Sequence, residues 1–149
     1  MPKSSGETLT VYAARLLAEG LSPDQVMKRM EQEGLNFPQV STVLLEMLGK
    51  YDASVEYLAD LTDSDPATLY RILNKQRNPG RNLLLRIALA LGLSLDDTQI
   101  LLKSANRATL SPVRERDIFI MDSIIKGDYY EELNETLTKN GMADLNGKG

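Results

Sequence analysis

Apolar residues recur three and four positions apart along most of the chain, which is the spacing of one face of an α-helix. Two clear examples are Leu9, Tyr12, Ala13, Leu16 and Leu17, and later Leu84, Ile87, Ala88 and Leu91. Apolar and polar residues do not alternate over any stretch long enough to suggest a strand. The sequence therefore predicts an all-α fold.

Turn-forming residues mark where these helices begin and end. Ser22-Pro23-Asp24-Gln25 has the composition of a capping box, and Asp65-Pro66 predicts a second helix start. Ser111-Pro112 predicts the start of a later helix, while Asn36-Phe37-Pro38 is typical of a connector. Because glycine closes helices in the left-handed conformation, we expect helix ends at Gly20, Gly34, Gly92, Gly127 and Gly141.

These boundaries indicate a central helical domain with a pair of helices on each side. We expect five helices in the central domain. The expected segments are a disordered tail at 1–6, a helical hairpin at 7–40, the central domain at 41–105, a second hairpin at 106–142 and a disordered tail at 143–149. The two tails are assigned because the ends of a chain fray unless something holds them.

The two hairpins have the same spacing of glycines. When the sequence is shifted by 107 residues, Gly20 meets Gly127 and Gly34 meets Gly141, with 13 residues between the glycines in both copies. One interpretation is a repeated hairpin. The other is that any helix–glycine–helix pair looks like this, since only the glycines are identical. Shared geometry is favoured over shared ancestry.

Composition removes several classes of function. The chain has 149 residues, 42% of them hydrophobic, which suffices for a sizeable core. It contains no cysteine and no histidine, which excludes disulfides, thiolate and imidazole metal ligands, and catalysis by either residue. We expect no metal, no cofactor and no enzymatic activity. Neither an apolar run of about 18 residues nor a signal-peptide core is present, so we expect a soluble, cytoplasmic protein.

Charge is distributed unevenly along the chain. The net charge is −4, yet residues 66–95 contain five basic residues and no acidic one. The remainder carries 12 basic and 21 acidic residues. A basic segment in an acidic chain indicates a contact with a polyanion. The alternative is a solvated face against which neighbouring acidic residues pack, and charge alone does not decide between the two.

Two short helices joined by a tight turn are predicted at the centre of the chain. Leu58-Ala59 allows the first helix to cross closely over the second, and Leu69 and Ile72 bury the inner face of the second. Together with Arg77-Asn78-Pro79 and the run from Ile87 to Ser94, this segment resembles the Cro-type phage-repressor helix-turn-helix family, also called the xenobiotic-response-element family. The resemblance covers about residues 41–105.

This resemblance implies a five-helix, lambda-repressor-like domain and a homodimer that binds double-stranded DNA. The second helix, about residues 66–76, would enter the major groove. The residues implied at the DNA are Ala67, Thr68, Tyr70, Arg71, Asn74, Lys75, Arg77, Asn78, Arg81 and Asn82. Thr68, Tyr70, Arg71 and Asn74 would read bases, and the residues from Lys75 onward would contact phosphates.

The sequence departs from the family where bases are read. Asp63 stands where the family usually has glycine in the turn, although aspartate tolerates the left-handed conformation. Asp65 and Pro66 occupy the mouth of the recognition helix, where a carboxylate faces phosphates and proline offers no hydrogen bond to a base. The leading hypothesis is a sequence-specific, repressor-like transcriptional regulator. The alternative is a protein–protein interaction module that has lost base reading and binds a protein partner through its terminal hairpins.

Overall fold

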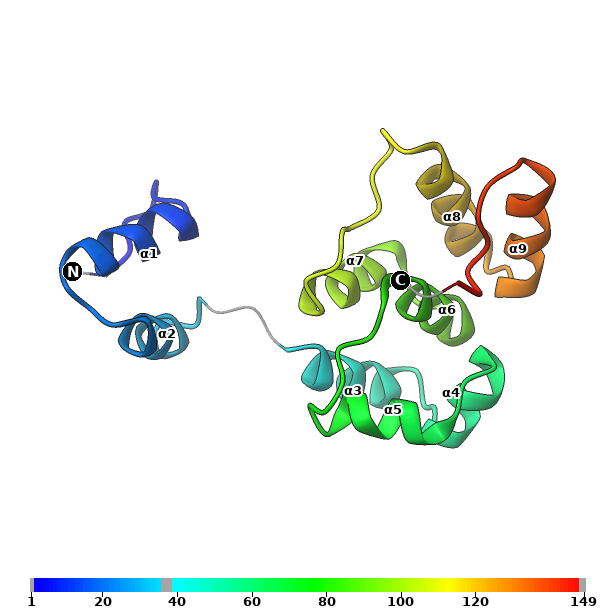
Figure 1. The fold of residues 1–149 in the computed structure, drawn as a ribbon, viewed down its shortest axis with the longest axis horizontal. Helices are drawn as coiled ribbons and strands as arrows, with labels where there is room; N and C mark the ends of the chain where they lie inside the picture. The colour runs from blue at the N-terminus through cyan, green and yellow to red at the C-terminus, as the bar shows by residue number, and fades with distance from the viewer. Residues whose placement is uncertain (1, 36–38, 148–149) are drawn as a thin grey trace. The chain divides into compact units, whose positions relative to one another are not determined.

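The computed structural model describes residues 2–35 and 39–147. Over these residues it has nine α-helices and no strand, which confirms the predicted all-α fold. The chain divides into two compact units, Met1–Phe37 and Pro38–Gly149 (Figure 1). The expected connector, Asn36-Phe37-Pro38, lies outside the described residues. No helix in the described ranges combines the length and the hydrophobicity that crossing a membrane requires.

The N-terminal unit is a pair of short helices, α1 (Leu9–Ala18) and α2 (Pro23–Gln32). The predicted capping box is confirmed, because the Ser22 N–H donates to Gln25 Oε1 at 2.8 Å and the Gln25 N–H donates to Ser22 Oγ at 3.2 Å. The buried core of this unit consists of Tyr12, Leu16 and Val26. A core of three side chains is small, so this unit gains little from hydrophobic burial.

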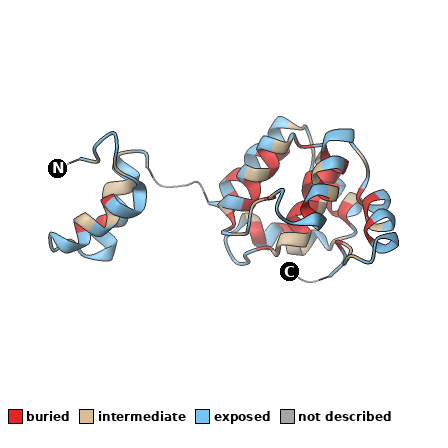
Figure 2. Ribbon diagram, turned by 90° about the horizontal axis from the view of Figure 1, so that it is seen from above, coloured by how far each residue is buried: buried red, intermediate tan, exposed pale blue. Residues whose placement is uncertain are grey.

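The larger unit contains the central domain and the second hairpin. Its first five helices are α3 (Val40–Lys50), α4 (Val55–Thr62), α5 (Pro66–Leu73), α6 (Arg81–Leu91) and α7 (Leu95–Ser104). They are followed by α8 (Glu115–Lys126) and α9 (Tyr130–Lys139), which pack against α6. Buried residues line the inner faces of these helices and form one continuous core (Figure 2).

The packing of α4 on α5 follows the sequence prediction. Leu58, Leu69 and Ile72 are at most 1% exposed and contribute to the main core. Burying each such side chain stabilises the fold by about 1.5–3 kcal/mol. Because α5 uses Leu69 and Ile72 to hold itself on α3 and α4, its opposite face remains available to solvent.

The helix α5 is shorter than the predicted range of 66–76. It ends at Leu73, with Asn74 as its C-cap. Lys75 then adopts the left-handed conformation, at φ 63°, and the Gln76 N–H donates to the Arg71 carbonyl at 2.8 Å. This hydrogen bond closes the helix as a Schellman motif does, with lysine in the place that glycine commonly takes.

The start predicted at Ser111-Pro112 is wrong. The helix α8 begins at Glu115, and its N-cap is Arg114, which makes no capping hydrogen bond through its side chain. The Ser111 N–H instead donates to Asp117 Oδ2 at 3.0 Å. Asp117, which lies inside α8, therefore accepts a hydrogen bond from Ser111, the residue that was expected to cap this helix.

The C-terminal segment differs from the expected disordered tail at 143–149. Leu145 is fully buried in the main core, and its N–H donates to Asn134 Oδ1 at 2.8 Å. The Arg86 guanidinium donates to the Leu145 carbonyl. One apolar side chain and these backbone hydrogen bonds hold residues 143–147 against α6 and α9.

The two hairpins have the same internal geometry. A shift of 107 residues places the bounds of α2 directly on those of α9. The Tyr129 N–H donates to Glu132 Oε1 at 3.2 Å, which repeats the hydrogen bond between Ser22 and Gln25. Gly127 and Gly141 have positive φ like Gly20 and Gly34, as predicted. The second helices of the two hairpins thus share their length and their N-terminal hydrogen bond. The first hairpin has a core of three side chains, whereas the second belongs to the main core of the larger unit.

Candidate nucleic-acid interface

The turn between α4 and α5 has the predicted conformation. Asp63 is the C-cap of α4 in the left-handed region, at φ 54° and ψ 43°. The Ser64 N–H donates to the Ala59 carbonyl at 2.9 Å, so the turn is closed by a backbone hydrogen bond. Aspartate therefore supports the turn that glycine usually makes in this motif.

Asp65 caps α5. Its Oδ1 accepts from the Ala67 N–H at 3.0 Å, and Pro66 occupies the first helical position. Both residues are exposed. A carboxylate at a helix N-terminus also interacts favourably with the helix dipole. The predicted capping role of this pair is confirmed.

The α5 residues that the resemblance places at the DNA are exposed or half-buried. Tyr70, Arg71 and Asn74 are exposed, and Ala67 and Thr68 are half-buried. The Tyr70 hydroxyl donates to Glu56 Oε1 of α4 at 2.6 Å. This hydrogen bond raises the pKa of Tyr70 and lowers the pKa of Glu56. Sequence reasoning missed Glu56, because its partner lies 14 positions away on another helix.

Three basic side chains near the end of α5 have no partner among the described residues. We call Arg71, Lys75 and Arg77 the α5 basic group, and all three are exposed. Most other basic side chains described in this unit form hydrogen bonds or ion pairs: Lys50, Arg81, Arg86, Lys103, Arg107, Arg114, Arg116 and Lys126. Apart from the α5 basic group, the exception within the described ranges is Lys139 on α9.

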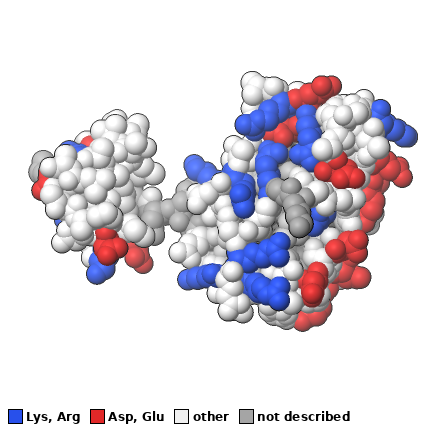
Figure 3. All heavy atoms as spheres, in the orientation of Figure 1, with Lys and Arg blue, Asp and Glu red and all other residues white. Residues whose placement is uncertain are grey.

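The surface around this group is asymmetric in charge. In Figure 3 many basic side chains lie over the left and middle of the visible face of the larger unit, and most acidic ones lie along its right edge, with a few at its top. The right edge is the side of α4 and α9 in Figure 1. The three unpaired cations of the α5 basic group attract a polyanion over a distance set by ionic strength.

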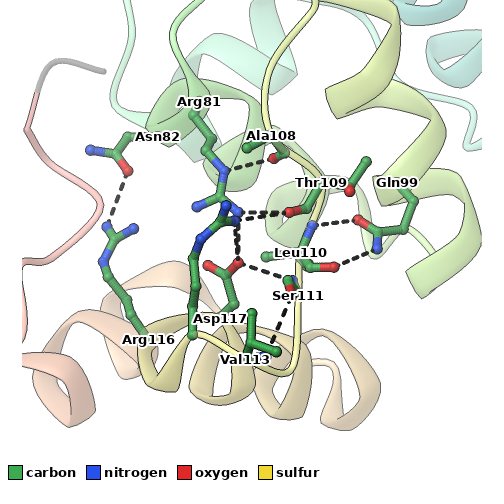
Figure 4. A network of polar contacts seen from close by, with 11 residues as sticks. Arg81, Asn82, Gln99, Ala108, Thr109, Leu110, Ser111, Val113, Arg116 and Asp117 are labelled. Carbon is green, nitrogen blue, oxygen red and sulfur yellow. Dashed lines mark hydrogen bonds and ion pairs between the residues drawn. The ribbon is translucent and has the colours of Figure 1, made fainter.

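Arg81, a predicted phosphate contact, instead joins α6 to α8 (Figure 4). Its Nη2 lies 3.0 Å from Asp117 Oδ2, and its Nε donates to the Ala108 carbonyl at 2.8 Å. Asp117 is 1% exposed. Burial alone would raise the pKa of Asp117, but hydrogen bonds from Arg81 and from the Ser111 N–H outweigh it and leave the pKa lowered. The geometry gives Arg81 a structural role.

Asn82 and Asn78 are also engaged within the chain. Asn82 Nδ2 donates to the Gly147 carbonyl at 3.0 Å, and Asn82 Oδ1 accepts from Arg116 at 3.1 Å. Asn78 Nδ2 donates to the Ala105 carbonyl at 3.1 Å. Each of these partners lies at least 27 positions away along the chain, and no local pattern in the sequence signals them.

Comparison with protein-family models gives a match to this part of the chain. Residues 46–97 match the protein-family model described as helix-turn-helix. The match begins within α3 and extends into α7, and it contains the α4–α5 turn. Searches of curated proteins and of solved structures found no match.

Proposed function

We propose that this chain, which carries a helix-turn-helix domain of the Cro and phage-repressor type, is a sequence-specific DNA-binding transcriptional regulator. The α5 basic group carries the proposal. Among the described residues of the larger unit, three of the four unpaired cations, Arg71, Lys75 and Arg77, lie together near the end of α5. Such groups displace counterions from DNA phosphates, which makes binding favourable and salt-sensitive.

In this proposal α5 lies in the major groove with its outward side at the bases. Thr68, Arg71 and Asn74 supply hydrogen-bonding groups for base edges, and Lys75 and Arg77 contact phosphates. Arg81, Asn82 and Asn78 are left out of the surface because their side chains already bond within the chain. The interface is therefore smaller than the sequence predicts.

We further propose that the protein acts in the cytoplasm as a homodimer. Family domains of this kind bind two half-sites about one helical turn apart. Ile118 and Ile125 lie seven positions apart on α8 and are 48% and 72% exposed. Met121 lies between them on the same side, partly buried. This apolar stripe on the second hairpin supports contact between two copies.

One observation favours the alternative, an interaction module without base reading. The mouth of α5 presents the Asp65 carboxylate, and the Tyr70 hydroxyl is held by Glu56. Both features place negative charge beside the surface that would meet DNA. A protein partner with basic side chains would suit this end of α5 better than a phosphate backbone does.

The deciding experiment is selection of genomic DNA by the purified protein at two salt concentrations. We expect enrichment of a short, two-fold related site. Arg77→Ala and Lys75→Ala should each weaken binding of cognate and random duplexes alike, and each should reduce the slope of log affinity against log salt by about one unit. Lys139→Ala, an unpartnered lysine on α9, is the matched control. Folded variants with unchanged affinity would support the alternative.

A further inference from the structure

A pocket lies beside the α5 basic group, where the start of α3 meets the ends of α5 and α7. Its volume is about 340 Å³. Sites for small molecules commonly span about 300–1,000 Å³. Gln39 and Ser41 form one side, and Lys75 and Arg77 form the other. The pocket thus shares two cations with the proposed DNA surface but extends away from the outward side of α5.

The charge of the pocket lining favours an anion. The described residues that line it include two cations and no carboxylate. Its remaining polar side chains are neutral amides and hydroxyls, among them Gln76 and Asn106. Two unpaired cations with hydrogen-bond donors around them form a setting in which an oxyanion is stabilised by charge-assisted hydrogen bonds.

Ser41 supplies an independent sign of a missing partner. Ser41 lines the pocket and is only 5% exposed, and its Oγ has no hydrogen-bond partner among the described residues. A buried hydroxyl without a hydrogen-bond partner destabilises a fold, because it has lost its hydrogen bonds to water. An acceptor bound in the pocket would take a hydrogen bond from this hydroxyl and remove that penalty.

The start of α3 adds a second source of donors. This helix has 11 residues, and its N-cap, Gln39, makes no capping hydrogen bond through its side chain. The N–H groups of its first turn therefore lack intrahelical partners, and the helix dipole favours an anion there. An anion at this end of α3 would serve as the missing cap.

Two helices end at the pocket and oppose an anion, but their last carbonyls are largely satisfied. The Gln76 N–H donates to Arg71 O at 2.8 Å at the end of α5, and the Arg107 N–H donates to Leu102 O at 2.9 Å at the end of α7. A helix end carries about half a charge, whereas Lys75 and Arg77 carry one whole charge each. The attraction of an anion to these two side chains therefore exceeds its repulsion by the two helix ends.

We propose that this pocket binds a phosphate group, held by Lys75, Arg77, the Ser41 hydroxyl and the first turn of α3. The phosphate belongs either to a free phosphorylated small molecule or to the backbone of DNA. With a free ligand, this site goes beyond the proposed regulatory function; with a DNA phosphate, it deepens that function and rests on it. If the chain also binds DNA, a free phosphorylated ligand competes with DNA for the same two cations.

The first arm of the test uses the full chain without DNA. Inorganic phosphate and pyrophosphate are titrated in turn while backbone amide shifts of Val40, Ser41 and Thr42 are followed by NMR, with chloride at equal ionic strength as reference. We expect saturable shifts. Lys75→Ala and Ser41→Ala should each weaken binding about tenfold, and Lys139→Ala should leave it unchanged. Saturable binding that is equally tight in all three variants overturns the proposal.

The second arm identifies the source of the phosphate. The same amides are followed during titration with a DNA duplex, and duplex affinity is measured for Ser41→Ala. Saturation by phosphate or pyrophosphate, with a duplex affinity that Ser41→Ala leaves unchanged, assigns the pocket to a free ligand. No response to the free ions, with a weakened duplex affinity, assigns it to the DNA backbone. No response in either arm overturns the proposal, and phosphate binding without DNA binding rejects only the regulatory function.

Discussion

Asp65 is subject to opposing requirements from helix stability and from DNA affinity. Its carboxylate caps α5 through the Ala67 N–H, which stabilises the helix. The same negative charge lies at the end of α5 that would approach phosphates. Serine at this position keeps the cap and removes the charge, so one substitution separates the two effects.

We expect Asp65→Ser to change the free energy of unfolding by less than about 1 kcal/mol. The variant should bind random duplex more tightly, and most clearly at low salt, where screening is weak. Urea unfolding and duplex titration at two salt concentrations measure both quantities. Glu135→Gln on α9 removes the same charge far along the chain and serves as control. Weaker binding by a folded Asp65→Ser would mean that the carboxylate accepts a hydrogen bond from a base.

Tyr70 and Glu56 form the second pair at the residue scale. The hydrogen bond holds the pKa of Glu56 below its ordinary value. The pair therefore stabilises the fold above the unfolded pKa of about 4.3, and the contribution disappears as pH falls through the lower folded pKa.

Tyr70→Phe should raise the pKa of Glu56 toward its ordinary value. NMR titration of the Glu56 carboxyl measures this shift, and Tyr57→Phe on the exposed part of α4 is the control. The stability difference between Tyr70→Phe and the natural protein should be present at neutral pH and vanish in acid. A difference that grows as the pH falls would contradict the pairing.

At the scale of helices, local and distant interactions differ in how well the sequence reveals them. Ser22 and Asp65 cap their helices through residues two or three positions away, and the sequence was sufficient to find both. Ser111 failed as a cap because Asp117, already buried against Arg81, accepts from its N–H. The intramolecular partners of Arg81 and Asn82 were not foreseen for the same reason, since they lie 36 and 65 positions away.

The contact between α6 and α8 depends on Asp117. Removing one member of a buried ion pair leaves the other without compensation, so Asp117→Ala should lower the free energy of unfolding by about 3 kcal/mol. Asp122→Ala, which breaks the exposed pair with Lys126 on the same helix, should change it by less than about 1 kcal/mol. Urea denaturation of both variants makes the comparison. Equal effects would show that the buried pair contributes nothing special.

At the scale of the whole molecule, the two units are unequal in hydrophobic burial. The main core draws its buried side chains from Val40 to Leu145, and the N-terminal unit contributes none of them. The all-α class and the order of the helices followed from periodicity. The burial of Leu145 could not be predicted in this way, because a single apolar residue in a polar segment forms no periodic pattern.

A chain of residues 38–149 should therefore unfold cooperatively, with a thermal midpoint within a few degrees of the full chain. The separate peptide 1–37 should have little helix, because short isolated helices are marginal in water. Circular dichroism during heating measures both. A larger unit that loses its cooperative transition when residues 1–37 are removed would contradict this division.

Lys75 holds a backbone conformation that glycine adopts without strain. Lys75→Gly should raise the free energy of unfolding by about 0.5–1 kcal/mol while weakening attraction to phosphates, and paired unfolding and duplex-binding measurements test this. Selection of variants for thermal stability alone would therefore favour Lys75→Gly, and the loss of affinity for phosphates would not be detected. Lysine at this position is thus a trade-off, in which the protein gives up robustness to keep a charge where the helix ends.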